Sequence, residues 1–335
     1  MTKENLRPQI LLLGTVRFAH EEWKQLDRVG DLVEYVPNGR DDFFQFLRGL
    51  PNLVAIYLTF PGYKAIGGFD NDVLDHLPKT LKYLCSFGAG YEILDVRAIG
   101  ARGIQVSNTP DTVSDATADT AIYLMIGALR NFHRLALDLR RGNWSSKTPE
   151  AHDPEKKVLG ILGLGGIGRK IRDRSLGFEF SEIIYHNRTR LSPGLEGDAK
   201  YVSFETLLAK SDILCLSVPL NAKTRHIINS EALSKCKDGV FIVNTARGAI
   251  IDEEALVLAL NSGKVSSVGL DVFEYEPKIH PELLANENVV LLPHVGTHTV
   301  ETRRAMEANV IDNIRAGLTT GKVQNLVPEL VDVFE

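Results

Sequence analysis

Cysteine, methionine and tryptophan are scarce in this 335-residue sequence, which contains three, three and two of them respectively. The cysteines, Cys85, Cys215 and Cys236, lie far apart, and two of them stand in apolar, strand-like surroundings. This spacing excludes a disulfide framework and a Cys/His metal site, and it indicates reduced packing residues in a cytosolic protein. We therefore expect no bound metal.

The chain also has no strong excess of charge and no long apolar run. Its formal net charge is −5 and its basic residues are scattered, so it offers no electrostatic footprint for nucleic acid. The start, MTKENLRPQI, is polar and resembles neither a signal peptide nor an Arg-rich presequence. No apolar run is long enough to span a bilayer. We expect a cytoplasmic protein without membrane or nucleic-acid partners.

Length and patterning predict two α/β domains, each with a doubly wound, Rossmann-like parallel sheet. The length suits about two domains, and the content of 44% apolar and 24% charged residues is that of an ordinary globular protein. Apolar runs alternate with helical stretches in the first third of the chain, which is typical of such a sheet. Strands are predicted over 9–13, 32–36, 53–58 and 81–85 and near Val106, with helices over 21–26 and 41–50.

A second alternation begins after Pro154 and fits one six- or seven-stranded nucleotide domain. It has strands over 158–162, 183–185, 213–218, 240–244, 268–272 and 289–292, and helices over 204–209, 229–236 and 252–261. The last predicted helix, 299–316, follows a completed domain, so the chain should cross back. We predict a discontinuous substrate (catalytic) domain of residues 1–108 plus 299–335 and an NAD(P)-binding Rossmann domain of residues 109–298. The ligands should lie in a cleft between these domains.

A helix is predicted over 114–131, directly after the breakers Asn108 and Pro110. Its apolar face is broader than one surface stripe requires, which predicts burial between domains or subunits. An Arg-rich segment with Trp144, residues 140–154, then leads into a glycine-rich stretch.

This stretch, KVLGILGLGGIGRKI, reads as strand, tight turn and helix. Gly163 permits the turn, Gly165 lets a pyrophosphate approach the backbone, and Gly168 lets the helix pack on the strand. The next predicted strand ends at Asn187, 19 residues after Gly168, about where a residue that contacts the ribose is expected. The pattern favours a dinucleotide site, although structural turns of this composition are common.

Three polar residues follow predicted strands of the second domain. Arg247 lies in VNTARG, Glu276 in GLDVFEYEP and His294 in LLPHVG. Taken singly, such residues are more often a solvated loop arginine, a surface turn glutamate or a satisfied interdomain histidine. Jointly, they match what carbonyl reduction requires, and we expect them to converge on the cleft.

The chemistry assigns each residue a role. A guanidinium can hold the carboxylate of a 2-oxo acid and polarise its carbonyl, which suits Arg247. An imidazole can protonate the forming alkoxide near neutral pH, which suits His294. A carboxylate bonded to that imidazole fixes its tautomer and favours its charged form, which suits Glu276.

The motifs GLGGIG, NTARGAIID, GLDVFEYEP and LLPHVGTHT, in this order and spacing, resemble the D-isomer-specific 2-hydroxyacid dehydrogenase family over essentially the whole chain. The resemblance implies an Arg, Glu and His that act together, at Arg247, Glu276 and His294. It also implies that backbone amides at Ala89 and Gly90 hold the substrate carboxylate, and that the protein forms a homodimer through the helix of residues 114–131 and the Trp144 segment.

The resemblance further implies a set of cofactor contacts along the second domain. Asp271 would lie under the nicotinamide, although capping of a strand is nearly as good an interpretation, and Thr117 would lie near the phosphates. The other implied contacts are Gly166, Ile167, Val218, Pro219, Thr245, Ala246 and Gly296.

The sequence departs from the commonest family pattern at the second strand, where many relatives have Asp. Here the segment is Asn187, Arg188, Thr189 and Arg190. A carboxylate would repel a 2′-phosphate, whereas an amide with a hydroxyl and guanidiniums would bind it. We predict a preference for NADP(H), with NAD(H) possible; the alternative is that Arg188 and Arg190 are solvated loop charges.

The segments NRTR, FEYEP and PHVGTHTVETR most resemble the fungal glyoxylate reductase branch, which implies glyoxylate and hydroxypyruvate as substrates and D products where chiral. Bulkier 2-oxo acids stay open, with the loop 59–64 and the Trp144 segment as possible pocket walls. Formate oxidation is disfavoured because the resemblance there requires an amide at Glu276, and phosphoglycerate oxidation because no regulatory domain follows Leu330. A corepressor-like binding protein remains the alternative of another class.

Overall fold

The computed structural model describes residues 7–144 and 148–334 and divides the chain into two compact units. Unit 1 comprises Met1–Val113 and His298–Glu335, and unit 2 comprises Ser114–Thr297. The borders predicted from the sequence, 108/109 and 298/299, lie five residues before the first of these and one residue after the second. The predictions made for the first six residues and for residues 145–147 of the Trp144 segment concern residues outside the described part of the chain.

Unit 1 contains a five-stranded parallel sheet in the order β2-β1-β3-β4-β5. Its side chains alternate between two apolar layers, because successive residues of a strand face opposite sides. Ile10 and Leu12 pack with Trp23 on one face, whereas Leu11 and Leu13 pack with Phe43 on the other. The strands are β1 (Gln9–Leu13), β2 (Asp31–Tyr35), β3 (Leu53–Leu58), β4 (Tyr83–Ser86) and β5 (Gln105–Ser107).

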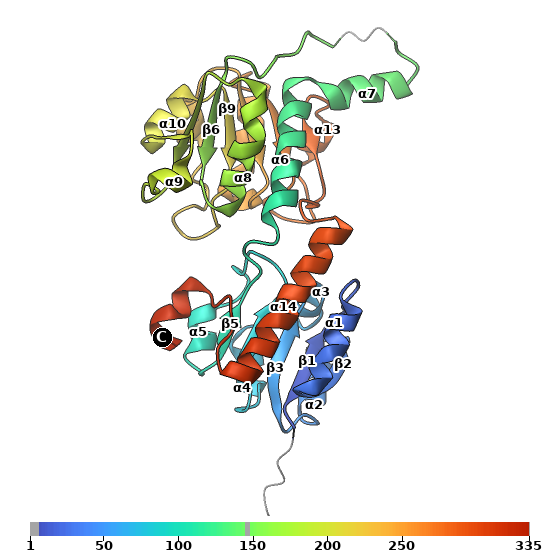
Figure 1. Cartoon of the computed structure of the whole chain (residues 1–335). Helices are drawn as coiled ribbons and strands as arrows, with labels where there is room; N and C mark the ends of the chain where they lie inside the picture. The colour runs from blue at the N-terminus through green and yellow to red at the C-terminus, as the bar shows by residue number, and fades with distance from the viewer. Residues whose placement is uncertain (1–6, 145–147, 335) are drawn as a thin grey trace, which may run out of the picture. The chain divides into compact units, whose positions relative to one another are not determined.

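Helices cover both faces of this sheet, and the long α14 crosses one of them (Figure 1). The helices of unit 1 are α1 (His20–Lys24), α2 (Arg40–Leu47), α3 (Phe60–Ala65), α4 (Asn71–His76), α5 (Val96–Gly100), α14 (Val300–Thr320) and α15 (Val331–Phe334), with 3-10 turns η1 (Gln25–Arg28) and η4 (Pro328–Leu330). Glu307 of α14 is buried, and its carboxylate accepts hydrogen bonds from the backbone N–H groups of Arg17, Phe18 and Ala19, at 2.8–2.9 Å. The connection from β1 to α1 is thereby attached to α14.

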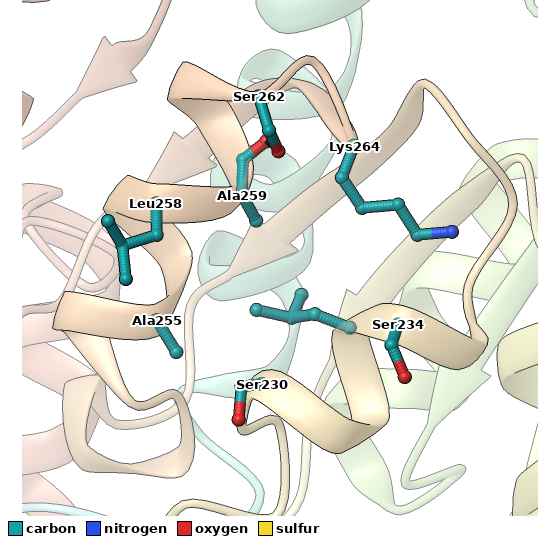
Figure 2. Close-up of a pocket in the computed structure, with 8 residues that line it drawn as sticks. Ser230, Ser234, Ala255, Leu258, Ala259, Ser262 and Lys264 are labelled. Atoms are coloured by element: carbon teal, nitrogen blue, oxygen red, sulfur yellow. Dashed lines mark hydrogen bonds between the residues drawn. The ribbon is translucent and has the colours of Figure 1, made fainter.

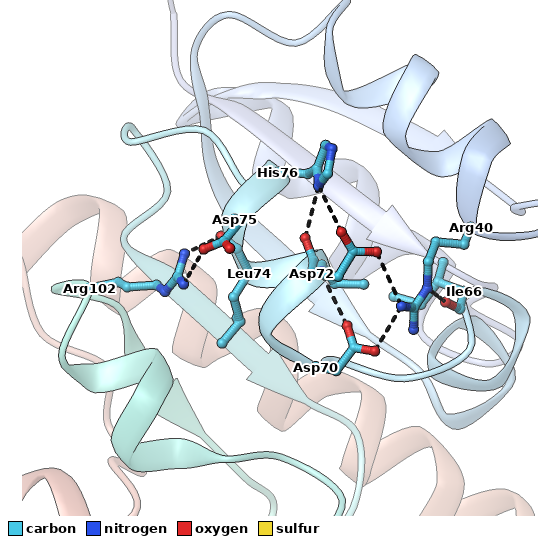
Figure 3. A network of polar contacts seen from close by, with 9 residues as sticks. Arg40, Ile66, Asp70, Asp72, Leu74, Asp75, His76 and Arg102 are labelled. Atoms are coloured by element: carbon cyan, nitrogen blue, oxygen red, sulfur yellow. Dashed lines mark hydrogen bonds and ion pairs between the residues drawn. The ribbon is translucent and has the colours of Figure 1, made fainter.

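A polar network ties α2 to the start of α4 (Figure 3). The Arg40 guanidinium lies 2.7 Å from Asp70 and 3.3 Å from Asp72, and it also donates to the carbonyls of Ile66 and Gly67. Asp70 in turn caps α4 by accepting the N–H of Val73. These contacts add to the burial of Ile66 and Phe69 in holding the loop between α3 and α4.

Unit 2 contains a seven-stranded parallel sheet in the order β12-β11-β10-β9-β6-β7-β8. The strand order reverses between β6 and β9, which is the point where doubly wound sheets bind their ligands at the carboxyl edge. The strands are β6 (Val158–Leu162), β7 (Glu182–His186), β8 (Lys200–Tyr201), β9 (Ile213–Leu216), β10 (Val240–Asn244), β11 (Val265–Leu270) and β12 (Val290–Leu291).

The helices α6 and α8 lie side by side on one face of this sheet (Figure 1). The helices of unit 2 are α6 (Ser114–Leu129), α7 (Phe132–Arg140), α8 (Gly166–Ser175), α9 (Pro193–Glu196), α10 (Phe204–Lys210), α11 (Ser230–Lys235), α12 (Glu253–Asn261) and α13 (Pro281–Ala285), with 3-10 turns η2 (Leu176–Phe178) and η3 (Gly248–Ile250). The fold class is the predicted one: two parallel α/β sheets, each wound on both faces.

The broad apolar face of α6 has a different partner from the one expected. Ala118, Ala121 and Leu124 pack against strands of unit 2 itself, together with Leu159 and Phe241. The approach is close, because a Cβ on Gly269 of β11 would stand 2.7 Å from the Cβ of Leu124. The width of the face therefore reflects burial on the unit's own sheet.

The three cysteines are buried free thiols: Cys85 on β4, Cys215 on β9 and Cys236 after α11. Burial raises the pKa of Cys85 and of Cys215 to about 12 and that of Cys236 to about 11. Among the described residues, no group of three His, Cys, Asp or Glu side chains is placed to hold a metal ion. No helix in that same part of the chain combines the length and the apolar character needed to cross a bilayer.

Candidate active site

Three adjacent strands of unit 2 carry the predicted catalytic residues beyond their carboxyl ends. Arg247 follows β10, Glu276 follows β11 and His294 follows β12, and these strands are neighbours in the sheet. Because parallel strands end at the same edge, the three loops lie on one side of the unit.

Glu276 and His294 form a hydrogen-bonded pair. His294 Nδ1 lies 2.8 Å from Glu276 Oε2, and Glu276 Oε1 accepts the N–H of Phe273 at 3.0 Å. Burial acts to raise the pKa of the Glu276 carboxyl. The hydrogen bonds from His294 and Phe273 and the charges of His294 and Arg247 outweigh burial, so the pKa of Glu276 is lowered. An ionised Glu276 therefore accepts a hydrogen bond from Nδ1–H of His294, which leaves Nε2 as the second nitrogen of the ring.

Asp271 holds the turn that presents His294. Its side chain is 1% exposed, and its carboxylate accepts the N–H groups of Val295 and Gly296 at 2.7 and 2.8 Å. Its carbonyl accepts the N–H of His294, which has a left-handed φ of 54°. Burial raises the pKa of Asp271, and the two backbone hydrogen bonds act against that rise. These contacts favour the structural interpretation of Asp271.

Thr117 of α6 lies beside the same turn. A Cβ on Gly296 would stand 3.0 Å from Asp271 Oδ2 and about 3.5 Å from the Thr117 side chain. The buried Thr117 is therefore a neighbour of the His294 loop within unit 2.

The loop of Arg247 is built on the buried Asn244. The Asn244 amide donates to the carbonyl of Arg247 at 2.9 Å and accepts the N–H of Ala246 at 3.0 Å, which closes a tight turn around Thr245. The Arg247 guanidinium donates to the carbonyl of Ala246 at 2.7 Å, and its charge contributes to the lowered pKa of Glu276. The next residue, Gly248, packs so closely that a Cβ there would stand 1.8 Å from the carbonyl carbon of Phe273.

The glycine-rich turn fits a pyrophosphate. Gly163 has a φ of 99°, and a Cβ there would stand 2.5 Å from the carbonyl oxygen of Ser217 and 2.8 Å from Val218. Gly168 packs on the Gly163 carbonyl, whereas a Cβ on Gly165 would meet open space. α8 begins at Gly166 with no side chain capping it, so the first N–H groups of the helix, including that of Ile167, are available to an anion. Pro219, beyond Val218, is exposed.

The end of β7 lies next to this turn, because Asn187 Oδ1 accepts the N–H of Leu164 at 2.7 Å. Arg188 and Thr189 are exposed. Arg190 instead forms a two-point ion pair with the buried Glu196, at 2.8 and 3.0 Å. Of the two guanidiniums in this segment, only that of Arg188 has no ion pair with another described residue.

In unit 1, the segment with Ala89 and Gly90 follows β4, at the carboxyl edge of that sheet. The amide of Asn108 donates to the carbonyl of Ala89 at 2.6 Å, and the Thr109 hydroxyl accepts the N–H of Gly88. These contacts fix the turn through neighbouring groups. Both Ala89 and Gly90 are half-buried.

A surface hollow of about 340 Å³ lies between α11 and α12 (Figure 2). It is lined by Leu233, Ala255, Leu258 and Lys264 together with serines, and none of the predicted site residues contributes to it. The Lys264 amine is already bonded to Asp238 and to the carbonyl of Cys236. This hollow is therefore not the predicted site.

Three further polar residues, which lie near the loops of Arg247 and Glu276, were not singled out from the sequence: His226, Glu253 and Glu274. His226 Nε2 lies 2.6 Å from Glu274 Oε1, and Glu253 accepts the N–H of Glu274 at 3.0 Å. The duplicated Glu in FEYEP was the available signal, because it places a second carboxylate two residues before Glu276.

Comparison with known proteins shows the family of this chain. The profile of the D-isomer specific 2-hydroxyacid dehydrogenase NAD binding domain matches residues 122–296. 4-Methyl-2-oxopentanoate reductase A of Aspergillus oryzae is 50% identical over 98% of this chain and 100% of its own length.

Two solved structures share the fold along nearly the whole chain. A glyoxylate reductase from Paecilomyes thermophila has a TM-score of 0.93 and 49% identity, covering 96% of this chain and 98% of its own. An NADPH-dependent glyoxylate/hydroxypyruvate reductase from Sinorhizobium meliloti, solved with NADP and malonate, has a TM-score of 0.84 and 32% identity, covering 96% and 97%. The chain belongs to the D-isomer-specific 2-hydroxyacid dehydrogenase family and is an oxidoreductase acting on small 2-oxo or 2-hydroxy acids.

Proposed function

We propose that the protein reduces glyoxylate or hydroxypyruvate to the 2-hydroxy acid, the D isomer where the product is chiral, with NADPH as the reductant. The observation that carries this proposal is the Glu276–His294 pair, whose Nδ1 to Oε2 distance is 2.8 Å, on loops adjacent to that of Arg247. The names of the relatives above support the substrate class.

The reduced nicotinamide, when bound, supplies a hydride to C2 of the 2-oxo acid. The Arg247 guanidinium polarises the C2 carbonyl and holds the carboxylate, in which the amides of Ala89 and Gly90 assist. The His294 Nε2 proton passes to the oxygen on C2 as it gains negative charge. The Glu276 carboxylate holds Nδ1–H and stabilises the imidazolium before that transfer.

The chain's preference for NADPH rests on Arg188. An exposed guanidinium and the neighbouring Thr189 hydroxyl suit a 2′-phosphate, and the usual carboxylate is replaced by Asn187, whose Oδ1 is bonded to Leu164. Substitution of Asn187 by Asp together with Arg188 by Ala should shift the preference towards NADH. Equal efficiencies of the native protein with the two coenzymes would contradict the proposal.

A bulkier 2-oxo acid is the second candidate, because the Aspergillus relative is a 4-methyl-2-oxopentanoate reductase at 50% identity. In unit 1, Phe60 is exposed beyond β3 and stacks with Tyr63, so this loop offers an apolar surface to a branched side chain. The ratio of kcat/KM for 4-methyl-2-oxopentanoate and glyoxylate decides between the two candidates.

We further propose a cytoplasmic homodimer. No residue of α7 is buried, and Phe132, Leu135 and Leu139 lie on one face of that helix at spacings of three and four residues. Trp144, which follows, is 89% exposed. Exposed apolar side chains on one face of a helix support an interface with a second copy. The three free thiols support a reducing compartment.

The proposed function is tested by a panel of 2-oxo acids with NADPH and NADH, repeated for His294→Ala. Loss of a general acid should lower kcat by roughly 10²- to 10⁴-fold. His152→Ala is the control, since His152 contacts Phe241 at the opposite end of β10 and should leave kcat within about twofold. No turnover of any 2-oxo acid, with binding of cofactor retained, would favour the corepressor-like alternative.

A further inference from the structure

We infer that Glu274, with His226 and Glu253, is a positioning group that sets the placement of the Glu276 loop relative to the Arg247 loop. The inference rests on the proposed roles of Arg247, Glu276 and His294. Glu274 stands two residues before Glu276, and its side chain is 3% exposed. It does not belong to the Glu276–His294 pair, because its carboxylate bonds to His226 instead.

The Glu274 carboxylate lies near donors from two segments of the chain, residues 225–226 and Glu253. Its Oε1 accepts His226 Nε2 at 2.6 Å and lies 3.4 Å from the Arg225 guanidinium, whereas its Oε2 accepts the backbone N–H of Glu253 at 3.3 Å. A carboxylate buried to this extent is costly unless it is paired. Its place in the fold is therefore fixed by these three donors.

Glu253 binds both ends of the loop that carries Glu276. It is 6% exposed, and its two oxygens accept the N–H of Glu274 and the N–H of His280, each at 3.0 Å. Because Glu274 also accepts the N–H of Glu253, the two glutamates hold each other reciprocally. The loop of residues 274–280 is thus closed at its base, with Glu276 inside it.

His226 connects the Glu253–Glu274 pair to the Arg247 loop. Its backbone N–H donates to the carbonyl of Ala249 at 2.9 Å, and Ile228 continues the pairing with Ile250 and Ile251. The segment of His226 is therefore hydrogen-bonded to η3, which begins one residue after Arg247. Its ring then reaches Glu274, so a single residue joins the two loops.

The two loops also touch directly, since Gly248 packs on the backbone of Phe273 and Glu274. A misplacement of a reacting group by about 1 Å can cost 10²-fold in rate. A link that fixes this spacing should therefore contribute to turnover without touching the substrate, and the size of its effect on kcat should depend on the presence of the Glu276 carboxylate.

The decisive experiment is a double-mutant cycle of Glu274→Gln and Glu276→Gln on the full-length protein, with glyoxylate and NADPH. Glu274→Gln alone should lower kcat about tenfold and change the Kd for NADPH, from fluorescence titration, by less than about twofold. In the Glu276→Gln background the same substitution should have little further effect. An equal loss of kcat in both backgrounds, or no loss in either, overturns the inference.

The control is Glu231→Gln, which removes an exposed carboxylate of α11 that pairs with Lys235, away from the loop of residues 274–280, and should leave kcat unchanged. His226→Ala breaks the link from the other side, and should lower kcat as Glu274→Gln does. His226→Gln retains a donor near the position of Nε2 and should restore most of the rate. Equal rates for these two His226 variants would also overturn the inference.

The outcome separates this inference from the proposed function. If Glu276→Gln and His294→Ala themselves retain native kcat, the proposed chemistry fails and the positioning role through Glu276 fails with it. If those two variants are impaired while Glu274→Gln and His226→Ala are not, the chemistry stands and only the positioning role is lost.

Discussion

At the scale of the residue, the Glu276 carboxyl is subject to opposing influences that leave its pKa below the ordinary value. Burial favours the neutral form, while His294, the Phe273 N–H and the Arg247 charge favour the ionised form and prevail. A carboxyl with a lowered pKa stabilises the folded state above its unfolded value, about 4.3, and that contribution disappears as the pH falls through the folded value.

The first prediction follows from the direction of this pKa shift. The free energy of unfolding in urea should be larger for the native protein than for Glu276→Gln at pH 7, and the difference should shrink as the pH falls below about 4.3. Because 35% of the side chain is exposed, solvent screening should keep the difference under about 1 kcal/mol. A difference that grows on acidification would mean that His294 is bonded to a protonated carboxyl.

The second prediction concerns Gly248. Substitution by Ala would place a Cβ 1.8 Å from the Phe273 backbone, and backbone cannot rotate away as a side chain can. We expect a loss of about 3 kcal/mol or more in the free energy of unfolding, together with reduced kcat, because the two catalytic loops would be forced apart.

Gly177→Ala is the matched control, since a Cβ there meets nothing within 4 Å. It should change the free energy of unfolding by no more than about 0.5 kcal/mol. Native stability and turnover in Gly248→Ala would show that the loops can separate without consequence.

The sequence predicts the position of single residues where they follow a strand. Arg247, Glu276 and His294 each follow an apolar run, and the structure places them beyond adjacent strands. The pairing of Arg190 with Glu196 could not be foreseen, because the burial of Glu196 depends on the packing of α9. The role of Glu253 was equally hidden, since its partners are 21 and 27 residues away in the chain.

At the scale of the element, the buried Glu307 carboxylate of α14 binds the backbone of the loop before α1, which is distant in the sequence. The three N–H groups that Glu307 accepts belong to residues 17–19, almost the full length of the chain away. No other described side chain accepts these N–H groups, so the polar attachment of residues 17–19 to α14 is made by the Glu307 carboxylate. Glu22 of α1 separately pairs with Arg304 of α14 at 2.8 Å.

The third prediction is that Glu307→Ala lowers the free energy of unfolding by about 3 kcal/mol or more, because each buried N–H left without a partner costs about 1–3 kcal/mol. Glu307→Gln, which keeps one acceptor oxygen, should lose less. Urea denaturation measures both.

Glu301→Ala, at an exposed position in the first turn of the same helix, should cost at most about 1 kcal/mol. A loss for Glu307→Ala no larger than for Glu301→Ala would indicate that water replaces the carboxylate at this site.

Element boundaries were predictable where apolar runs are unbroken. β1, β3 and β10 have the predicted limits, because runs of four to six consecutive apolar residues define them. β11 begins at Val265 instead of residue 268, since the polar Ser266 and Ser267 obscured its start; Ser267 is buried and bonds the carbonyl of Asn288. α7 was not predicted as a helix, because its arginines mask the apolar face.

At the scale of the whole molecule, the exposed apolar face of α7 predicts self-association. The fourth prediction is that Leu139→Asp shifts the protein from dimer to monomer in analytical ultracentrifugation, because a charge would be buried in an apolar interface. Leu258→Asp on α12 is the control, since Leu258 is exposed to a similar extent elsewhere and should leave the sedimentation coefficient unchanged. A monomeric native protein would remove the proposed interface.

The buried thiols can report on the opening of each unit separately. Cys85 reports on unit 1 and Cys215 on unit 2, and with a pKa of about 12 only about one thiol in ten thousand is a thiolate at pH 8. A maleimide or disulfide reagent should therefore modify them only when a unit opens, at rates that mass spectrometry can assign to each cysteine. The same shielding means that the protein should keep its activity through storage in air without added reductant.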